Sequence, residues 1–173
     1  MPLDLIRGTH SEPPADAIVR DPRQPRFYQH LCPPFPNEPR RDRLSVVETA
    51  DGKGEGVQAL VAFAPGEIVF TFTGTVLGEQ TLFTLQIEPG RYISDPLMMG
   101  KVLHSCDPNM DCDMATLTFR ARRYIAPGEM LSMDYETTED ELFRSFHCGC
   151  GSANCRGLIR GRRFQGLVYS RVG

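Results

Sequence analysis

The chain has 173 residues, a length typical of one domain rather than two. Hydrophobic residues make up 40% and charged residues 24%, which excludes the composition of a disordered chain. The formal net charge of −3 provides no overall attraction to phosphate, so we do not expect a nucleic-acid ligand.

Two further features bear on the compartment. No stretch approaches ~18 consecutive apolar residues, and the N-terminus lacks the basic and apolar regions of an export signal. We therefore expect no membrane span, an intracellular location that is cytoplasmic or nuclear, and a monomer. The six cysteines should then remain thiols, and closely spaced ones are better interpreted as metal ligands or reactive groups than as disulfides.

Proline dominates the beginning of the chain. Nine of the fourteen prolines lie in residues 1–43, and each fixes φ and removes a backbone donor. This composition predicts an extended N-terminal arm over residues 1–43. Within it we expect a packed patch at residues 27–31, where Phe27 and Tyr28 would otherwise face water.

The middle of the chain favours short strands. β-branched and aromatic residues gather in runs that are bounded by glycine or proline, at residues 44–48, 57–62, 68–73, 82–87 and 116–120. Ala-Pro-Gly-Glu occurs at residues 64–67 and 126–129, and its Pro-Gly pair suits the central positions of a type II turn. The expected fold class is mainly β with short helices.

One helix is predicted after Tyr135, over residues 137–147. Thr138 and Glu141 have the spacing of a capping box, and apolar residues follow on one face. From Arg156 onward the chain carries five arginines and no acidic residue. This basic end indicates either attraction to acidic or phosphate-bearing surroundings of a substrate, or a solvated tail.

Cysteines cluster near the C-terminus. Cys148, Cys150 and Cys155 stand within eight residues, and glycines separate them. A structural zinc ion takes four thiolate or imidazole ligands, so three local thiolates require a fourth from elsewhere. The simpler alternative is that the cysteines are small buried hydrophobic side chains. The residues alone leave four candidates for the fourth ligand, namely Cys106, Cys112, Cys32 and His147.

Three further patches are weak evidence on their own. Residues 52–56 form a glycine-rich loop before a strand, without a phosphate-binding pattern. Residues 104–109, His-Ser-Cys-Asp-Pro-Asn, fit an ordinary turn, and residues 128–135 end on an ordinary aromatic side chain, Tyr135. Their order along the chain, followed by the cysteine trio, is more specific than any one of them.

Taken in this order, the four patches resemble the SET-domain protein-lysine methyltransferases that carry a cysteine-rich post-SET segment. The family shows Gly-x-Gly, then Asn-His-Ser-Cys-x-Pro-Asn, then Gly-Glu-Glu-Leu-x-Phe-Asp-Tyr, then Cys-x-Cys-x4-Cys-x-Gly. The corresponding segments are residues 54–56, 103–109, 128–135 and 148–157. The resemblance covers about residues 44–160. It divides the chain into the arm at 1–43, a SET domain at 44–136, the linking helix at 137–147, and a post-SET zinc segment with an arginine-rich tail at 148–173.

The resemblance implies a fold of small antiparallel sheets. In that fold, the segment bearing Tyr135 is threaded as a pseudoknot under the loop at residues 103–109. S-adenosylmethionine would lie against Gly54, Glu55, Gly56, Leu103, His104 and Tyr135. One structural zinc ion would be held by Cys106, Cys148, Cys150 and Cys155, and Phe164 or Tyr169 would cover the site.

The resemblance also implies the reaction, which is methyl transfer to the side-chain amine of a lysine in a protein or peptide. Such a displacement needs orientation and a neutral amine, and an apolar channel lowers the pKa of an entering amine. Tyr135 is the implied catalytic residue and lines the substrate channel with Met133. Met133 stands where the family has Phe or Tyr, which favours more than one methyl group per amine. Leu103 stands where the family has Asn, so the side-chain amide bonds made there are missing.

Two other functions remain open on the sequence. One is a catalytically inactive SET-like zinc module that binds a peptide or nucleic-acid partner through its arginine-rich end, and Leu103 supports this alternative. The other is methylation of a non-lysine or small-molecule amine. Binding of S-adenosylmethionine distinguishes the inactive module from an enzyme.

Overall fold

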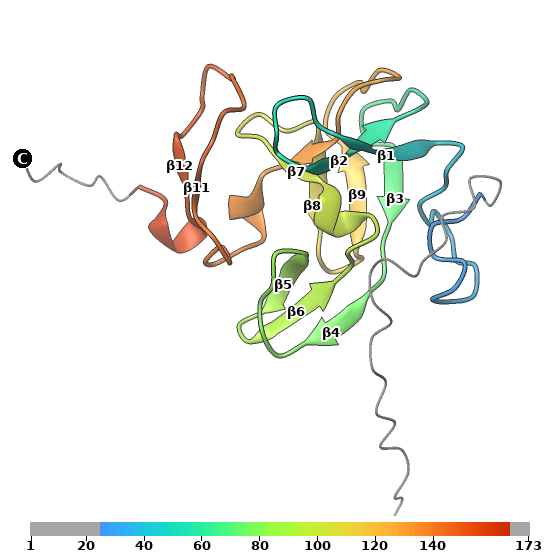
Figure 1. The fold of residues 1–173 in the computed structure, drawn as a ribbon, viewed down its shortest axis with the longest axis horizontal. Helices are drawn as coiled ribbons and strands as arrows, with labels where there is room; N and C mark the ends of the chain where they lie inside the picture. The colour runs from blue at the N-terminus through green and yellow to red at the C-terminus, as the bar shows by residue number, and fades with distance from the viewer. Residues whose placement is uncertain (1–24, 167–173) are drawn as a thin grey trace, which may run out of the picture.

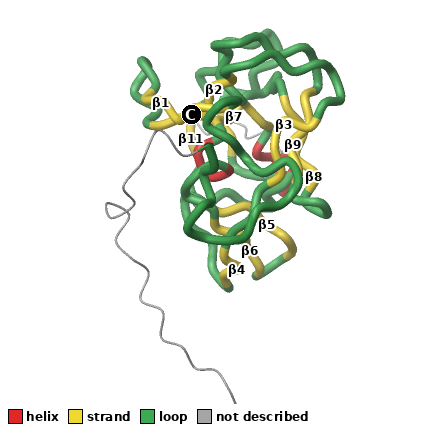
Figure 2. The backbone as a smooth tube through the Cα atoms, turned by 90° about the vertical axis from the view of Figure 1, so that its right-hand side faces the viewer, coloured by secondary structure: helices red, strands yellow, loops and turns green. Residues whose placement is uncertain are grey.

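The computed structural model describes residues 25–166, in which short strands form five small sheets (Figure 1). The strands are β1 (Leu44–Glu48), β2 (Glu55–Ala59), β3 (Ile68–Thr71), β4 (Thr75–Leu77), β5 (Thr84–Glu88), β6 (Arg91–Ser94), β7 (Leu103–His104), β8 (Met110–Asp113), β9 (Thr118–Ala121), β10 (Ser132–Met133), β11 (Phe146–His147) and β12 (Leu158–Ile159). Single turns of 3-10 helix stand at η2 (Met99–Lys101), η3 (Tyr135–Thr137) and η4 (Arg162–Phe164). Loops connect these elements over much of the backbone (Figure 2). None of the helices in residues 25–166 has the length and apolar character that crossing a bilayer requires.

The sheets are small and mostly antiparallel, as predicted. β1 pairs with β2, β9 lies between β3 and β8, β6 lies between β4 and β5, and β11 pairs with β12. Only β10 and β7, among the described strands, pair in parallel. That parallel pair brings residues 132–133 beside residues 103–104, which is the proximity that threading of the Tyr135 segment requires.

Each of the five predicted strand runs overlaps a strand. β1 has the predicted bounds, and β2, β3, β5 and β9 overlap the other four runs with shifts of a few residues at their ends. Their inward side chains form the core, in which the rings of Phe70 and Phe72 lie 4.8 and 5.5 Å from that of Phe119. All three rings are at most 1% exposed. Burial of such aromatic surface is the main stabilising contribution that these short strands make.

The predicted packed patch in the N-terminal arm is confirmed for two of its residues. Phe27 is 8% exposed and Tyr28 is fully buried, whereas Leu31 is 58% exposed. The Tyr28 hydroxyl donates to the Asp95 carboxylate at 2.5 Å, and backbone amides of residues 97–99 donate to the same carboxylate. Tyr28 therefore fixes this part of the arm to the turn that precedes η2.

The two Ala-Pro-Gly-Glu segments form the same kind of turn, as predicted. Gly66 and Gly128 have φ values of 82° and 87°, which only glycine adopts without strain. In both turns the glutamate closes the loop, because its Oε2 accepts a hydrogen bond from the alanine amide three residues earlier, at 2.9 Å for Glu67 and 3.0 Å for Glu129. The sequence repeat thus reflects a local capping arrangement.

The prediction of a helix over residues 137–147 is wrong. After η3 the chain is irregular until β11, and the Thr138 hydroxyl donates back to the Tyr135 carbonyl instead of capping a new helix. The amides that a helix would use are engaged elsewhere. Asp140 N donates to the Gln86 side chain at 2.8 Å, and Leu142 N donates to the Arg160 carbonyl at 2.7 Å. Tertiary hydrogen bonds outweigh the local helix signals here.

Candidate active site and cysteine cluster

The segment that leads into Tyr135 is held against the loop at residues 103–109. Ser105 N donates to the Met133 carbonyl at 3.0 Å, next to the parallel β7–β10 pair. Asn109 is 1% exposed, and its side-chain oxygen accepts from Ser132 N at 2.9 Å. These bonds make the position of the Tyr135 ring depend on a loop thirty residues earlier in the sequence.

Tyr135 is partly buried, and its hydroxyl and backbone N–H are both engaged. Its hydroxyl donates to the Val102 carbonyl at 2.7 Å, and its backbone N–H donates to His104 Nδ1 at 3.2 Å. Burial raises the pKa of the Tyr135 hydroxyl, and the Glu139 carboxylate raises it further. The hydroxyl therefore stays protonated at neutral pH, as a hydrogen-bond donor of fixed direction.

His104 serves as a neutral link between Tyr135 and the cysteines. Burial lowers its pKa to about 4, although Asp134 opposes this shift. Because Nδ1 accepts from Tyr135 N, the ring proton lies on Nε2, which donates to Cys106 Sγ at 3.5 Å. His104 therefore does not act as a base at neutral pH.

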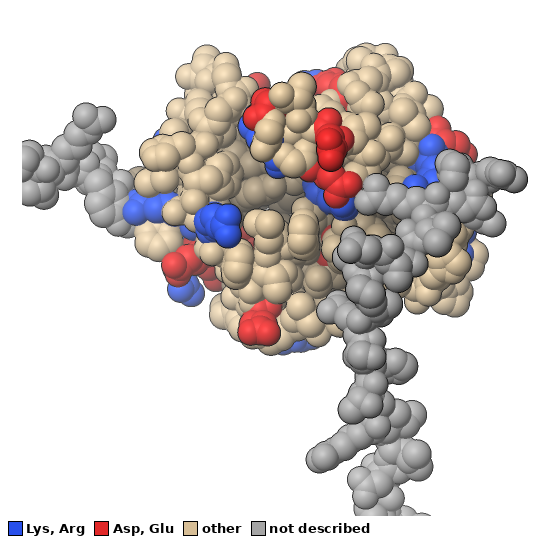
Figure 3. All heavy atoms as spheres, viewed as in Figure 1, with Lys and Arg blue, Asp and Glu red and all other residues tan. Residues whose placement is uncertain are grey.

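Tyr135 and Met133 line one narrow cavity, of about 110 Å³. Thr84 of β5, Val102, Glu139 and Phe146 line it as well. Figure 3 shows a hollow in the molecular surface, which in this view lies just above the position of β4, β5 and β6 in Figure 1. Met133 is 1% exposed, so its thioether belongs to the wall of the cavity and not to the outer surface. Both predicted channel residues thus face one cavity.

Five of the six predicted cofactor residues lie in two neighbouring segments, at 54–56 and 103–104, and the sixth is Tyr135. Glu55 forms an ion pair with Lys101, the last residue of η2, and η2 contacts β2. A Cβ added to Gly56 would stand 2.4 Å from the terminal methyl of Met130 and 3.0 Å from the Leu103 side chain, so a larger residue there would have to displace the Met130 methyl. Gly54 has a φ of 87° and open space around it. Gly56, in β2, thus lies against Leu103, whereas Gly54 just before the strand is exposed.

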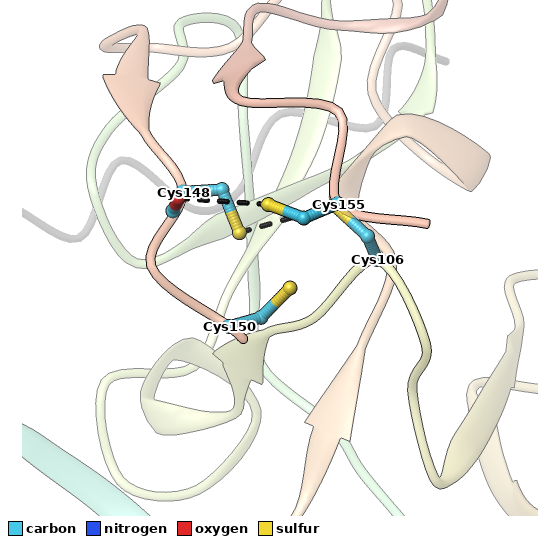
Figure 4. Close-up of side chains that lie close together, drawn as sticks. All are labelled: Cys106, Cys148, Cys150 and Cys155. Carbon is cyan, nitrogen blue, oxygen red and sulfur yellow. Dashed lines mark hydrogen bonds between the residues drawn. The ribbon is translucent and has the colours of Figure 1, made fainter. Parts of the chain in front are cut away.

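Four cysteine sulfurs meet at one point (Figure 4). The Sγ atoms of Cys106, Cys148, Cys150 and Cys155 all lie within 4.8 Å of one another. Burial raises the pKa of Cys148 to about 12, whereas a hydrogen bond from the Ser152 hydroxyl lowers that of Cys150 to about 5. The set offers four soft donors, which is the composition of a closed tetrahedral zinc site.

The other candidates for a fourth ligand lie outside this cluster. The Cys112 thiol contacts the Met114 sulfur at 3.6 Å, and burial raises its pKa. The Cys32 carbonyl accepts a hydrogen bond from the Arg26 guanidinium, and His147 is exposed. Of the four candidates, only Cys106 lies in the cluster. It is 5% exposed, and its Sγ accepts a hydrogen bond from Arg156 N at 3.4 Å.

Arginines of the C-terminal segment pair with acidic residues of the same domain. Arg156 bonds Asp134 at 2.5 Å and Glu136 at 2.9 Å, and Arg162 bonds Asp140 at 2.6 Å. Arg160 stacks over the Phe164 ring at 4.8 Å. The sequence missed these partners because they lie some twenty residues earlier. The expected basic surface is therefore largely neutralised among residues 156–164.

Two residues beside Tyr135 were not predicted. The Phe146 ring lies 5.5 Å from His104 and 6.1 Å from Tyr135, and Glu139 is 3% exposed at the cavity wall. Both fall in the segment that the sequence presented as an amphipathic helix. Of the two predicted aromatic covers, Phe164 lies in η4, and Tyr169 falls outside the described residues.

The comparisons with known proteins agree with this geometry. The SET domain model matches residues 54–136. Methyltransferase flvH of Aspergillus flavus is 31% identical over 135 residues, which cover 75% of this chain and 75% of that protein. This chain belongs to the SET-domain family. The predicted family is thereby confirmed.

Other SET-domain relatives are larger. Histone-lysine N-methyltransferase Su(var)3-9 of Drosophila melanogaster is 28% identical and covers 69% of this chain, which spans only 25% of that protein. Among solved structures, KRYPTONITE in complex with mCHH DNA, H3(1-15) peptide and SAH matches with a TM-score of 0.54 and 25% identity. That match covers 66% of this chain and 29% of KRYPTONITE. The predicted SET fold is confirmed.

Proposed function

We propose that this chain is a protein-lysine N-methyltransferase that uses S-adenosylmethionine and one structural zinc ion. The observation that carries the proposal is the narrow cavity shared by Tyr135 and Met133, near the end of the region, residues 54–136, that the SET domain model matches. We propose an intracellular location, cytoplasmic or nuclear, because all six cysteines are unpaired thiols.

The chemistry of the two neighbouring segments fits the proposed cofactor. Gly54, Glu55, Gly56, Leu103, His104 and Tyr135 would hold it, mainly through the backbone. Support comes from the open surface at Gly54 and from the Glu55–Lys101 ion pair, which joins the two segments. The KRYPTONITE structures, which are described as complexes with SAH, support the same cofactor. When bound, S-adenosylmethionine supplies an electrophilic methyl group.

The side chains of the cavity would orient the amine. The wall at Val102, Met133 and Phe146 removes water from an entering lysine, which lowers the pKa of its ammonium group. The Tyr135 hydroxyl, fixed on the Val102 carbonyl, presents its oxygen to the amine as an acceptor. Positioning of this kind contributes as much as ~7–11 kcal/mol to a displacement reaction.

A second, outer cavity gives a path for the rest of the substrate. It has a volume of about 420 Å³ and adjoins the first at Gln80, Leu142 and Phe143. Asp140, Glu141 and Arg163 also line it, and Asp140 pairs with Arg162 and Arg163, so Glu141 is the acidic group that suits a basic residue near the target lysine. We therefore propose a peptide substrate and no direct nucleic-acid ligand.

The four clustered cysteines would bind the zinc ion. The bonds from Ser152, His104 and Arg156 N to cluster sulfurs are those that stabilise thiolates. The ion would join the loop bearing Cys106 to the post-SET segment and so keep Phe146 beside Tyr135.

A second candidate function is methylation of a small-molecule amine. The relative that matches three quarters of both chains is named a methyltransferase without a histone substrate. An inactive zinc module is the third candidate, and it is supported by Leu103, whose side chain packs on Gly56 where the family has an amide.

One experiment distinguishes the three candidates. Calorimetric titration with S-adenosylmethionine should show saturable binding, and labelled cofactor should then transfer its methyl group to protein in a cell extract. Label that enters only the small-molecule fraction would favour the second candidate. An absence of saturable binding would favour the inactive module.

A further inference from the structure

A buried carboxylate lines the same cavity as Tyr135 and Met133. Glu139 is 3% exposed, and it lines the cavity between β5 and the segment that follows η3. Its Oε1 accepts from Gln86 N at 2.7 Å, and its Oε2 accepts from Gln80 Nε2 at 2.8 Å. An ionised carboxylate has about four acceptor sites, so each oxygen can take another donor.

The surroundings make this carboxylate a stronger base than an exposed one. Burial raises the pKa of Glu139, while the bonds from Gln86, Gln80 and Thr138 and the charge of Arg162 oppose that shift. The other titratable groups that interact with it are Tyr135 and Cys112, whose pKa values it raises. Both therefore stay protonated and neutral beside it.

The two accepted bonds account for an acceptor at both side-chain oxygens, because a glutamine could accept from only one of Gln86 N and Gln80 Nε2. They do not compensate the charge, and a buried ionised carboxylate is costly unless a cation compensates it. The nearby Arg162 bonds Asp140 at 2.6 Å. A cationic ligand that enters the cavity would provide the compensation that the folded chain supplies only in part.

We propose that Glu139 is a second catalytic residue, which binds the ammonium group of the substrate and accepts one of its protons. The inference rests on the proposed function. One N–H bond of the ammonium breaks, one O–H bond forms on the carboxylate, and the electron pair stays on nitrogen. The amine becomes a nucleophile, and the charged pair becomes a neutral pair, which suits a cavity walled by Val102, Met133 and Phe146. The carboxyl proton returns to water after product release.

The decisive test is the pH dependence of kcat for Glu139→Gln, with core histones as acceptor. We expect the pH at which the rate reaches half its plateau to rise by at least about one unit, toward the value of ~10.4 of a free lysine amine. Glu139→Asp keeps an ionisable group, so its profile should stay near that of the unmodified chain although its rate falls. Glu79→Gln, at an exposed carboxyl that lines neither cavity, is the matched control and should change neither. A Glu139→Gln profile that keeps its position would overturn the proposal.

A measurement on the unmodified chain covers the case in which these variants do not fold or histones are not methylated. With S-adenosylhomocysteine present, n-butylammonium should bind at least about tenfold more tightly than 1-butanol, its neutral analogue of equal length. Equal affinities would refute the role of Glu139 and leave the proposed function intact. Failure of S-adenosylhomocysteine itself to bind would overturn both.

Discussion

Tyr135→Phe removes one oxygen atom and keeps the ring that packs against His104 and Phe146. The lost hydroxyl donates to the Val102 carbonyl at 2.7 Å, and a hydrogen bond of this kind contributes a net ~0.5–1.5 kcal/mol to folding. For a chain of this size, ~1 kcal/mol lowers Tm by roughly 2–4 °C. We expect that small decrease together with a fall in methylation rate of at least about tenfold, or ~1.4 kcal/mol in barrier.

The assay separates the chemical role from the structural one. Initial rates are measured with labelled S-adenosylmethionine, alongside cofactor affinity, metal content and thermal unfolding. Tyr124→Phe deletes the same atom from a ring that is 57% exposed, so it should leave the rate unchanged. A Tyr135→Phe protein that binds the cofactor and methylates at the unmodified rate would remove the hydroxyl from the mechanism.

The other predictions concern the metal, the product and the arm. Cys106→Ser should lose zinc, measured by elemental analysis, whereas Cys112→Ser should keep it, because only Cys106 lies in the cluster. The opposite pattern would identify a different fourth ligand. Met133→Tyr should shift products toward monomethyl lysine in mass spectra, since a tyrosine crowds the wall that Met133 forms, while the unmodified chain adds further methyl groups. Products that do not change would assign the limit to another residue. Tyr28→Phe should cost about 1.5–3 kcal/mol in urea unfolding, because it removes the bond to the buried Asp95 carboxylate. An unchanged midpoint would mean that the arm is not anchored there.

The strands and turns were predictable because their signals are local. Residues 68–71 and 118–121 contain β-branched and aromatic side chains, and Pro-Gly pairs select the turn before the first strand and the turn after the second. Cys148, Cys150 and Cys155 are also local. Their partner Cys106 stands forty residues earlier, so the residues alone left it among four candidates, and only the resemblance to a family selected it.

The segment after Tyr135 was not predictable in the same way. Thr138 and Glu141 carry a helix signal, but the hydrogen bonds that decide the conformation run to Gln86 and Arg160, which are remote in sequence. Periodicity contains no information about such partners. The same error hid Glu139, because a helix would have left that residue on a solvated face.

The cysteine cluster and the active site share one set of interactions. Arg156 donates its backbone amide to Cys106 Sγ, and its guanidinium bonds Asp134 and Glu136, the two neighbours of Tyr135. Asp134 is 12% and Glu136 is 5% exposed at the side chain, so both would be costly to bury without that cation. A change that frees Cys106 therefore also removes a support from the residues beside Tyr135. For this reason a metal that touches no substrate would still determine whether the tyrosine ring is correctly placed.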